Sequence, residues 1–318
     1  MANRTPPTRT FNTVKHSNRE KRNHKNMQKR ALLLGIMTVT ALLVLALLVF
    51  AVCSIVAAVQ DNRSEGAIEY QDITKFSADV NTGALVIINQ TQSFTPSTAS
   101  LVTLNAGNIP AIDGKPIYGI ANSSIRMHSD AKLAFDNMMK VFGDEEPVTI
   151  TSAYRAPSGS SGHSDHHSGY LLALGTADGA PLAASENQDH WIFKNCHKYG
   201  FVIRYPEGKE DVTGVGKGGS FADYDYTEAL RYVGVAHATY MKENNLCLEE
   251  YAEKVKDYSQ DSQLKINGAD GNLYSVYYVP ASTTEITQFK VPSNYQYEVS
   301  GDNIGGFIVT VNLSSPLE

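Results

Sequence analysis

The stretch "GFVIRYPEGKEDVTG" runs from Gly200 to Gly214 and opens with β-forming residues that predict a strand. Four further distinctive stretches stand around it in a fixed order. "ITSAYR" (150–155) and "SDHHSG" (164–169) come before it, and "LRYVGVAHA" (230–238) and "LCLEEY" (246–251) come after it. These five stretches, taken together, carry the assignment of the fold.

The body of the chain mixes helices and strands. Ser129 is placed to cap a helix in which apolar residues recur at helical spacing until Gly143. A capping-box pattern at Ser185 marks the start of another helix. The predicted strands are 84–89, 148–155 and 201–206, and the predicted helices are 129–142, 185–199 and 227–245. Because these elements do not alternate strictly, the sequence predicts an α+β fold.

The last part of the chain has a different character. From Leu264 onward β-forming residues dominate, and turn-forming stretches such as "NGADGN" separate them. The sequence therefore predicts a small β unit over residues 259–318. Three tyrosines of this unit either fill its core, which we favour, or line a sugar-binding face. They are Tyr274, Tyr277 and Tyr278.

The charge of the chain is unevenly spread. Residues 1–30 hold nine Lys or Arg side chains and one Glu. The rest holds 18 of the 27 basic and 32 of the 33 acidic residues, which gives it a net charge of −14. A basic tail on an acidic body is compatible with nucleic-acid binding. The next segment favours another explanation, and no nucleic-acid partner is predicted.

Residues 31–59 carry no charged side chain and exceed the roughly 20 apolar residues that a helix needs to cross a bilayer. The run is also longer than the apolar part of a signal peptide. Because the basic flank is N-terminal, residues 1–30 are expected in the cytoplasm and the body outside. A polar stalk is predicted for residues 60–82. The alternative to a transmembrane helix is a buried helix, which fits such a long run less well.

The five stretches together resemble the VanY-type D-alanyl-D-alanine carboxypeptidases, a branch of the LAS zinc peptidases. The resemblance covers residues 83–258. It implies an extracytoplasmic α+β domain of the bacterial cell envelope, with a small antiparallel sheet and flanking helices. It also implies a substrate class, the peptidoglycan stem peptides that end in D-Ala-D-Ala.

The family motif Ser-x-His-x-x-Gly-x-Ala-x-Asp provides two zinc ligands, its His and its Asp. A later Glu-x-x-His stretch provides the third ligand and the general base. A catalytic zinc needs three protein ligands and one open position for water. The metal lowers the pKa of that water, and a nearby carboxylate takes its proton.

This chain keeps only the first half of that motif. Ser164, His166 and Gly169 match it, but the Asp position holds Ala173. Alanine has no lone pair to give to a metal. His166 is therefore a remnant of the zinc site rather than part of a complete one.

The second half of the site has lost its ligand as well. By the same resemblance, the second His position holds Ala229 and the base position holds Tyr226. A shift in register would bring Asp225 or Glu228 to the base position, but no shift supplies a histidine. Tight zinc binding is not expected from His166 alone, so no cofactor is predicted.

Two groups of residues leave alternatives open. His163, His166 and His167 either form a new metal site or are polar residues on a surface loop, which the Ser- and Gly-rich context favours. Cys196 and Cys247 either form a disulfide or remain as buried thiols.

The resemblance also indicates Arg155, Ser164 and Tyr154 as substrate-binding residues. The family arginine at the position of Arg155 contacts the substrate or stabilises developing negative charge. A guanidinium suits this role because it holds a carboxylate by two parallel hydrogen bonds. The alternative for Arg155 is a surface ion pair.

The sequence therefore predicts a single-pass protein of the bacterial cell membrane with an inactive extracytoplasmic VanY-like domain. This domain would bind stem peptide or another wall-associated partner. One alternative is an active zinc D,D-carboxypeptidase with an unusual metal site. The other is a structural protein of an envelope assembly. Metal content separates the first alternative from the rest, and peptide binding separates the second.

Overall fold

The computed structural model describes the C-terminal four-fifths of the chain. Residues 67–318 form one compact unit. The predicted tail, 1–30, and the predicted transmembrane segment, 31–59, lie outside the described residues. Among the described helices, none combines the length and the apolar character needed to span a bilayer. The described residues are 67–143, 147–182, 187, 189–206, 209 and 229–317.

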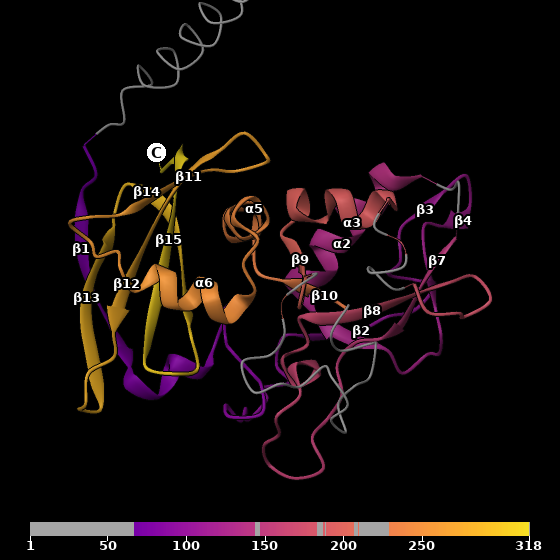
Figure 1. Cartoon of the computed structure of the whole chain (residues 1–318), viewed down its shortest axis with the longest axis horizontal. Helices are drawn as coiled ribbons and strands as arrows, with labels where there is room; N and C mark the ends of the chain where they lie inside the picture. The colour runs from indigo at the N-terminus through magenta and orange to yellow at the C-terminus, as the bar shows by residue number, and fades with distance from the viewer. Residues whose placement is uncertain are drawn as a thin grey trace, which may run out of the picture. The chain divides into compact units, whose positions relative to one another are not determined.

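The first sheet has the strand order β5–β7–β8–β10–β9 (Figure 1). β5 and β7 are parallel, and all other neighbours are antiparallel. The strands are β5 (Gly119–Ile120), β7 (Val148–Ser152), β8 (Leu171–Thr176), β9 (Phe201–Ile203) and β10 (Leu230–Tyr232). The structure also has a two-stranded sheet of β2 (Leu101–Thr103) and β6 (Arg126–His128) and a short hairpin of β3 (Ala111–Ile112) and β4 (Lys115–Pro116).

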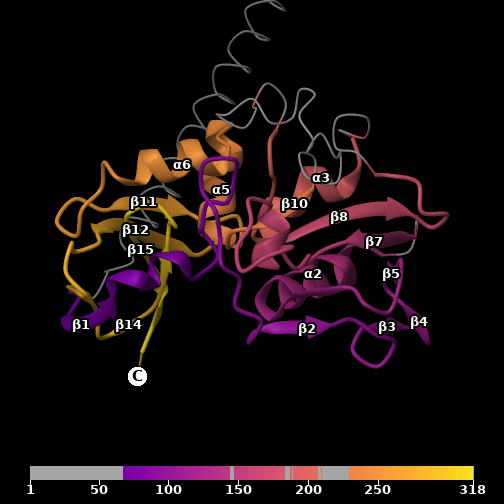
Figure 2. The same ribbon diagram turned by 90° about the horizontal axis from the view of Figure 1, so that it is seen from below.

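Helices cover one face of this sheet, as Figure 2 shows for α2. The side chains of β8 alternate, so that Leu172 and Leu174 join the apolar cluster under the helices. Leu171 and Ala173 point to the opposite face. The helices are α2 (Ser129–Phe142), α3 (Trp191–Asn195), α5 (Val235–Asn244) and α6 (Leu248–Val255), with 3-10 turns η1 (Ser77–Asn81), η2 (Asp165–Ser168) and η3 (Cys196–Tyr199).

The second sheet is antiparallel, with the order β11–β12–β15–β14. One face packs on α5 and α6, and the other packs on the two-stranded ribbon of β1 and β13. Tyr277 is fully buried in the core on the ribbon side, whereas Tyr274 and Tyr278 are partly buried against the helix side. The strands are β1 (Tyr70–Phe76), β11 (Leu264–Asn267), β12 (Leu273–Pro280), β13 (Ile286–Pro292), β14 (Tyr295–Gly301) and β15 (Gly306–Pro316).

Most elements read from the sequence are confirmed. The helix 129–142 ends at Gly143, whose positive φ of 77° suits glycine. Its cap is one residue earlier than predicted, because the His128 ring, rather than Ser129, accepts the hydrogen bond from the amide of Asp130. The strands within 148–155 and 201–206 and the C-terminal β strands are also present.

Two predictions for elements near the first sheet are wrong in part. Residues 230–232 form strand β10, and the helix begins only at Val235, because Gly234 turns the chain with a φ of 88°. The helix predicted from Ser185 begins at Trp191, where the ring of His190 caps it. The predicted capping box around Ser185 lies outside the described residues.

Two further predictions are wrong at least in part. The first assigned a strand to a buried apolar run, and the second assigned an irregular stalk to a polar run. Residues 84–89 are not a strand but a buried connection, in which Leu85 and Ile87 pack on one cluster and Val86 on another. Residues 60–66 of the predicted stalk lie outside the described part of the chain. Within the rest, Tyr70–Phe76 form strand β1, whose backbone pairs with β13 and which buries part of its alternating side chains.

A buried ionic network joins the elements of the two sheets. Arg204 donates from Nε to Asp165 at 2.7 Å. Its two terminal nitrogens donate to the two carboxylate oxygens of Glu249 on α6, at 2.8 and 2.6 Å. Arg231 on β10 donates from Nε to both oxygens of Asp165, at 3.0 Å each, and from its terminal nitrogen to the carbonyl oxygen of Val86. The two positive and two negative charges balance, so the network is neutral.

The balance matters because all four charged groups are removed from water. Arg204, Arg231 and Asp165 are fully buried, and Glu249 is nearly so. Burial alone would raise the pKa of Glu249, but the charge and hydrogen bonds of Arg204 outweigh it and lower the pKa to about 2. Removing one member leaves an uncompensated buried charge, which costs about 3–5 kcal/mol.

We predict that Glu249→Gln lowers the free energy of unfolding by about 3 kcal/mol at pH 7, because Arg204 loses its partner. The folded-state pKa of Glu249 lies below its unfolded value of about 4.5. The stability from this group is therefore complete above that value and is lost as the pH falls toward 2. The difference between wild type and variant should shrink over this range, measured by urea unfolding.

Glu253→Gln on the same helix is the matched control, because Glu253 is exposed and pairs only with Lys256. It should change the free energy of unfolding by less than about 0.5 kcal/mol. Equal effects of the two substitutions would show that the buried network does not contribute as described.

Candidate functional site

The two positions at which the family motif places zinc ligands lie together in the structure. Ala173 on β8 and Ala229, just before β10, belong to one small buried cluster. Its other members are Leu171, Tyr205 and Cys247. The antiparallel pairing of β8 with β10 brings these positions together. The motif positions therefore converge as predicted, but they carry methyl groups where metal donors would be needed.

His166 lies on η2 and is fully buried. Its Nδ1 is 2.5 Å from the carbonyl oxygen of Ala153, which fixes the orientation of the ring. Burial first, and then the positive charge of Arg155, lower the pKa of His166 to about 4. The imidazole is therefore neutral at pH 7. The chain leaves η2 at Gly169, where φ is 77° and an added Cβ would lie 2.6 Å from the Leu101 side chain.

These residues do not fit a catalytic zinc. Such a site needs three protein ligands, and His166 is the one predicted ligand position that still holds a donor. The Cys247 thiol of the apolar cluster is not a substitute, because burial raises its pKa to about 11 and keeps it protonated. Within the described part of the chain, no three His, Cys, Asp or Glu side chains are grouped to hold a metal ion.

The neighbouring histidines do not rebuild a site. Nδ1 of His163 lies 3.0 Å from the carbonyl oxygen of Asn89, and Nδ1 of His167 lies 2.7 Å from that of Arg155. Together with His166, each ring is therefore bound to a different backbone carbonyl. The three rings anchor the loop "SGHSDHHSG" rather than converge on one point.

The predicted substrate-binding residues stand at the edge of this loop. Arg155 is exposed, and its Nε donates to Ser152 at 2.9 Å. The backbone amide of Arg155 also donates to the carbonyl of His166, so the guanidinium and the histidine are held near each other. Ser164 is half-buried at the start of η2, and the Tyr154 ring lies under the guanidinium of Arg126.

Two other predictions have different outcomes. Cys196 and Cys247 are both free and buried, which resolves the open alternative in favour of thiols. They lie in different apolar clusters. The base position, Tyr226, and its substitutes Asp225 and Glu228 fall outside the described residues.

The sequence analysis missed the residues that organise this site. Asp165 lies between two histidines of the motif, yet it is the centre of the ionic network rather than a ligand. Glu249 in "LCLEEY" and the arginines of "GFVIRYP" and "LRYVG" are its partners. The sequence shows that Arg204 and Arg231 each stand in an apolar stretch, where an unpaired charge would be costly, but it does not show which acids are their partners.

Residues 134–219 match the family model described as "VanY: D-alanyl-D-alanine carboxypeptidase". These residues are therefore similar to the VanY-type D-alanyl-D-alanine carboxypeptidases. The matched region includes η2, β8 and the whole of the "GFVIRYPEGKEDVTG" stretch, and so spans the motif in which His166 remains and Ala173 stands at the Asp position.

Two relatives of the VanY-type domain extend the match. A D-alanyl-D-alanine carboxypeptidase of Enterococcus faecium is 35% identical over 210 residues, which are 61% of this chain and 64% of that protein. A D-alanyl-D-alanine carboxypeptidase of Enterococcus faecalis (strain ATCC 700802 / V583) is 36% identical over 95 residues, 30% of this chain and 32% of that protein. The chain therefore spans less than two thirds of the length of these relatives.

The fold of the VanY-type domain is also similar to a solved structure. The crystal structure of the vancomycin resistance D,D-dipeptidase VanXYg in complex with a D-Ala-D-Ala phosphinate analog has a TM-score of 0.59 to this chain. It is 23% identical and covers 77% of this chain and 99% of that chain. At this level of identity the similarity concerns the fold alone.

We predict that His166 makes the fold sensitive to mild acid. Its folded-state pKa of about 4 lies below its unfolded value of 6.5. The unfolded chain therefore takes up a proton first, and stability is lost as the pH falls from about 6.5 to 4. His166→Asn keeps a donor near the Nδ1 position but has no group that titrates in this range. In unfolding experiments, the free energy of unfolding of the variant should therefore fall by about 3 kcal/mol less than that of wild type between about pH 6.5 and 4. An unchanged pH dependence in the variant would contradict the neutral, buried imidazole.

Proposed function

We propose that the VanY-type domain is a non-catalytic module that binds peptidoglycan stem peptides ending in D-Ala-D-Ala. The observation that carries this proposal is the apolar cluster of Ala173, Ala229, Leu171, Tyr205 and Cys247. It occupies the convergence point at which the family motif would hold zinc. Without the metal, the domain lacks the group that activates water for attack on the peptide bond.

Stem-peptide binding is supported by what remains around the lost metal. Two relatives are named D-alanyl-D-alanine carboxypeptidases. Arg155 is exposed beside His166 and carries a guanidinium suited to a terminal carboxylate. Its neighbours His167 and Ser152 hold the backbone and the side chain of Arg155 in place. Recognition of the C-terminal carboxylate therefore does not depend on the missing ligands.

The location follows from the N-terminal segment. Residues 31–59 are uncharged and long enough to cross a bilayer, and the basic residues 1–30 precede them. In our proposal this segment anchors the chain in the bacterial cell membrane, with the VanY-type domain and the β unit on the outside. Stem peptides of the wall would then be within reach.

We predict that the protein binds a stem pentapeptide weakly, with a Kd on the order of 0.1–1 mM, and releases no D-Ala from it with or without added zinc. Arg155→Ala should reduce binding below detection, because truncating one partner of a charge pair costs about 2–5 kcal/mol. Titration followed by NMR measures the binding, and mass spectrometry of the peptide measures release.

The matched control is the same pentapeptide with a C-terminal amide. Wild type should bind this amidated peptide more weakly than the free acid. The decrease in affinity should equal the decrease that Arg155→Ala causes for the free acid, because both changes remove the same ion pair. D-Ala release that His166→Ala abolishes would instead establish an active enzyme. Absence of saturable binding by wild type would favour a structural role in an envelope assembly.

We predict that protease added to intact cells removes the VanY-type domain and spares residues 1–30, because the basic flank retains the N-terminus in the cytoplasm. Tags at the two ends of the chain, read by immunoblot, measure the result. Protection of the C-terminal tag in intact cells, with cleavage after lysis, would contradict this orientation.

A further inference from the structure

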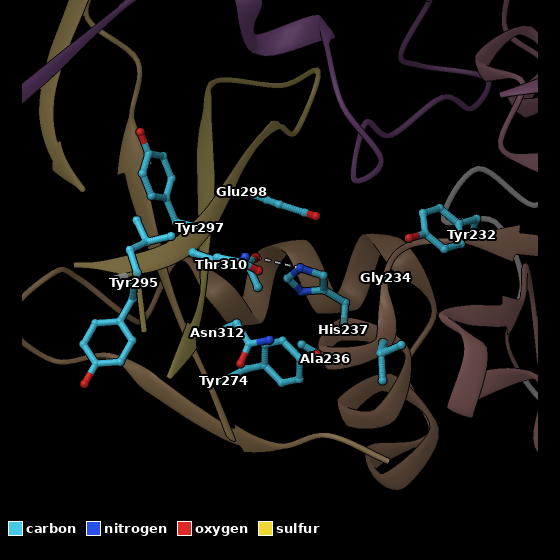
Figure 3. Close-up of a pocket in the computed structure, with 13 residues that line it drawn as sticks. Tyr232, Gly234, Ala236, His237, Tyr274, Tyr295, Tyr297, Glu298, Thr310 and Asn312 are labelled. Atoms are coloured by element: carbon cyan, nitrogen blue, oxygen red, sulfur yellow. Dashed lines mark hydrogen bonds between the residues drawn. The ribbon is translucent and has the colours of Figure 1, made fainter. Parts of the chain in front are cut away.

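A pocket lies between the second sheet and the beginning of α5. Its volume is about 490 Å³, which is within the range of small-molecule sites, about 300–1,000 Å³. Strands β14 and β15 form one wall, and the turn from β10 into α5 forms the opposite one (Figure 3). All of these elements belong to the described unit.

The walls of this pocket are rich in tyrosine. Tyr274 comes from β12 and Tyr232 from the end of β10, whereas the ring of Tyr297 on β14 packs on the opposite, ribbon side of the sheet. Figure 3 shows Glu298 extending from β14 toward Tyr232, and the Tyr297 ring pointing away from it. Aromatic faces carry partial negative charge and attract cations that lie over them.

The charge of the pocket is negative. Glu298 is its one charged lining residue, and no Lys or Arg side chain is among the residues that line it. Within the described part of the chain no hydrogen bond or ion pair to the Glu298 carboxylate is present. Burial first, and then the negative charge of Asp130, raise the pKa of Glu298. Glu298 is nevertheless an exposed residue, so a ligand can reach its carboxylate from solvent.

The one histidine of the pocket does not compensate this charge. His237 is buried, and burial lowers its pKa to about 3, so that it is neutral at pH 7. Its Nε2 is 2.8 Å from the Thr310 hydroxyl, and its Nδ1 is 2.5 Å from the Tyr251 hydroxyl. Both ring nitrogens of His237 are therefore engaged, and the side chain is a structural part of the pocket wall. Figure 3 shows the hydrogen bond between His237 and Thr310.

We infer that this pocket binds a ligand through a cationic amine, such as the ammonium group of a lysine-like side chain. The ammonium would pair with Glu298 and lie against the face of Tyr232, while its aliphatic stem contacts the rings of Tyr232 and Tyr274. A bare metal ion fits less well, since no three carboxylate, imidazole or thiol groups converge here among the described residues. The inference does not depend on the function proposed for the VanY motif.

The test compares n-pentylamine with its neutral isostere 1-pentanol, by NMR titration of the full-length protein in detergent at pH 7. Pentylamine should produce saturable shifts of the pocket tyrosine signals, and 1-pentanol should bind at least about tenfold more weakly. Glu298→Gln should weaken pentylamine at least about fivefold without changing 1-pentanol. Tyr232→Leu, a second variant, should also weaken the amine.

Glu243→Gln is the matched control, because Glu243 is an exposed acid on α5 that does not line the pocket. It should leave amine binding unchanged. Equal binding of the amine and the alcohol, or no effect of Glu298→Gln, would overturn the inference. So would saturable binding of N-acetylglucosamine that Glu298→Gln abolishes, because the pocket would then be a saccharide site.

Discussion

The structure depends on the buried contact between Asp165 and two arginines. Asp165 lies on the loop of the zinc motif, Arg231 on strand β10 between β8 and β9, and Arg204 directly after β9. Through Glu249, Arg204 extends the network to α6, which packs on the second sheet. A loop that carries the family motif is thereby tied to both halves of the described unit. Because each charge is buried, each needs its partners, and the four residues act together.

This arrangement explains how the fold persists at a site that has lost its metal ligands. In many small metal-binding domains the metal itself contributes folding energy. Here the loop is held by the ionic network, by three histidine rings on backbone carbonyls and by the turn at Gly169. The positions at Ala173 and Ala229 then need only to fill space, and the apolar cluster does so.

The sequence was sufficient where periodicity and local motifs determine structure. The helix 129–142 and the strands β7 and β9 follow from such patterns. That Ala173 and Ala229 stand at the positions of two zinc ligands is instead what the family resemblance implies. The strand at 70–76 could not be predicted, because its partner β13 lies more than 200 residues away. The buried run at 84–89 has the composition of a strand, and only the surrounding packing shows that it is a connection. The partners of Asp165 were equally hidden, since ion pairs between distant segments leave no local pattern.

The central claim is that two alanines, rather than a rearranged site, separate this domain from a zinc-binding one. The most direct measurement is a calorimetric zinc titration of the metal-free wild type and of the double variant Ala173→Asp, Ala229→His. The account predicts no stoichiometric binding by wild type and one zinc per chain in the double variant, because His166 then has two further ligands in reach. Tight one-to-one zinc binding by wild type would contradict the account.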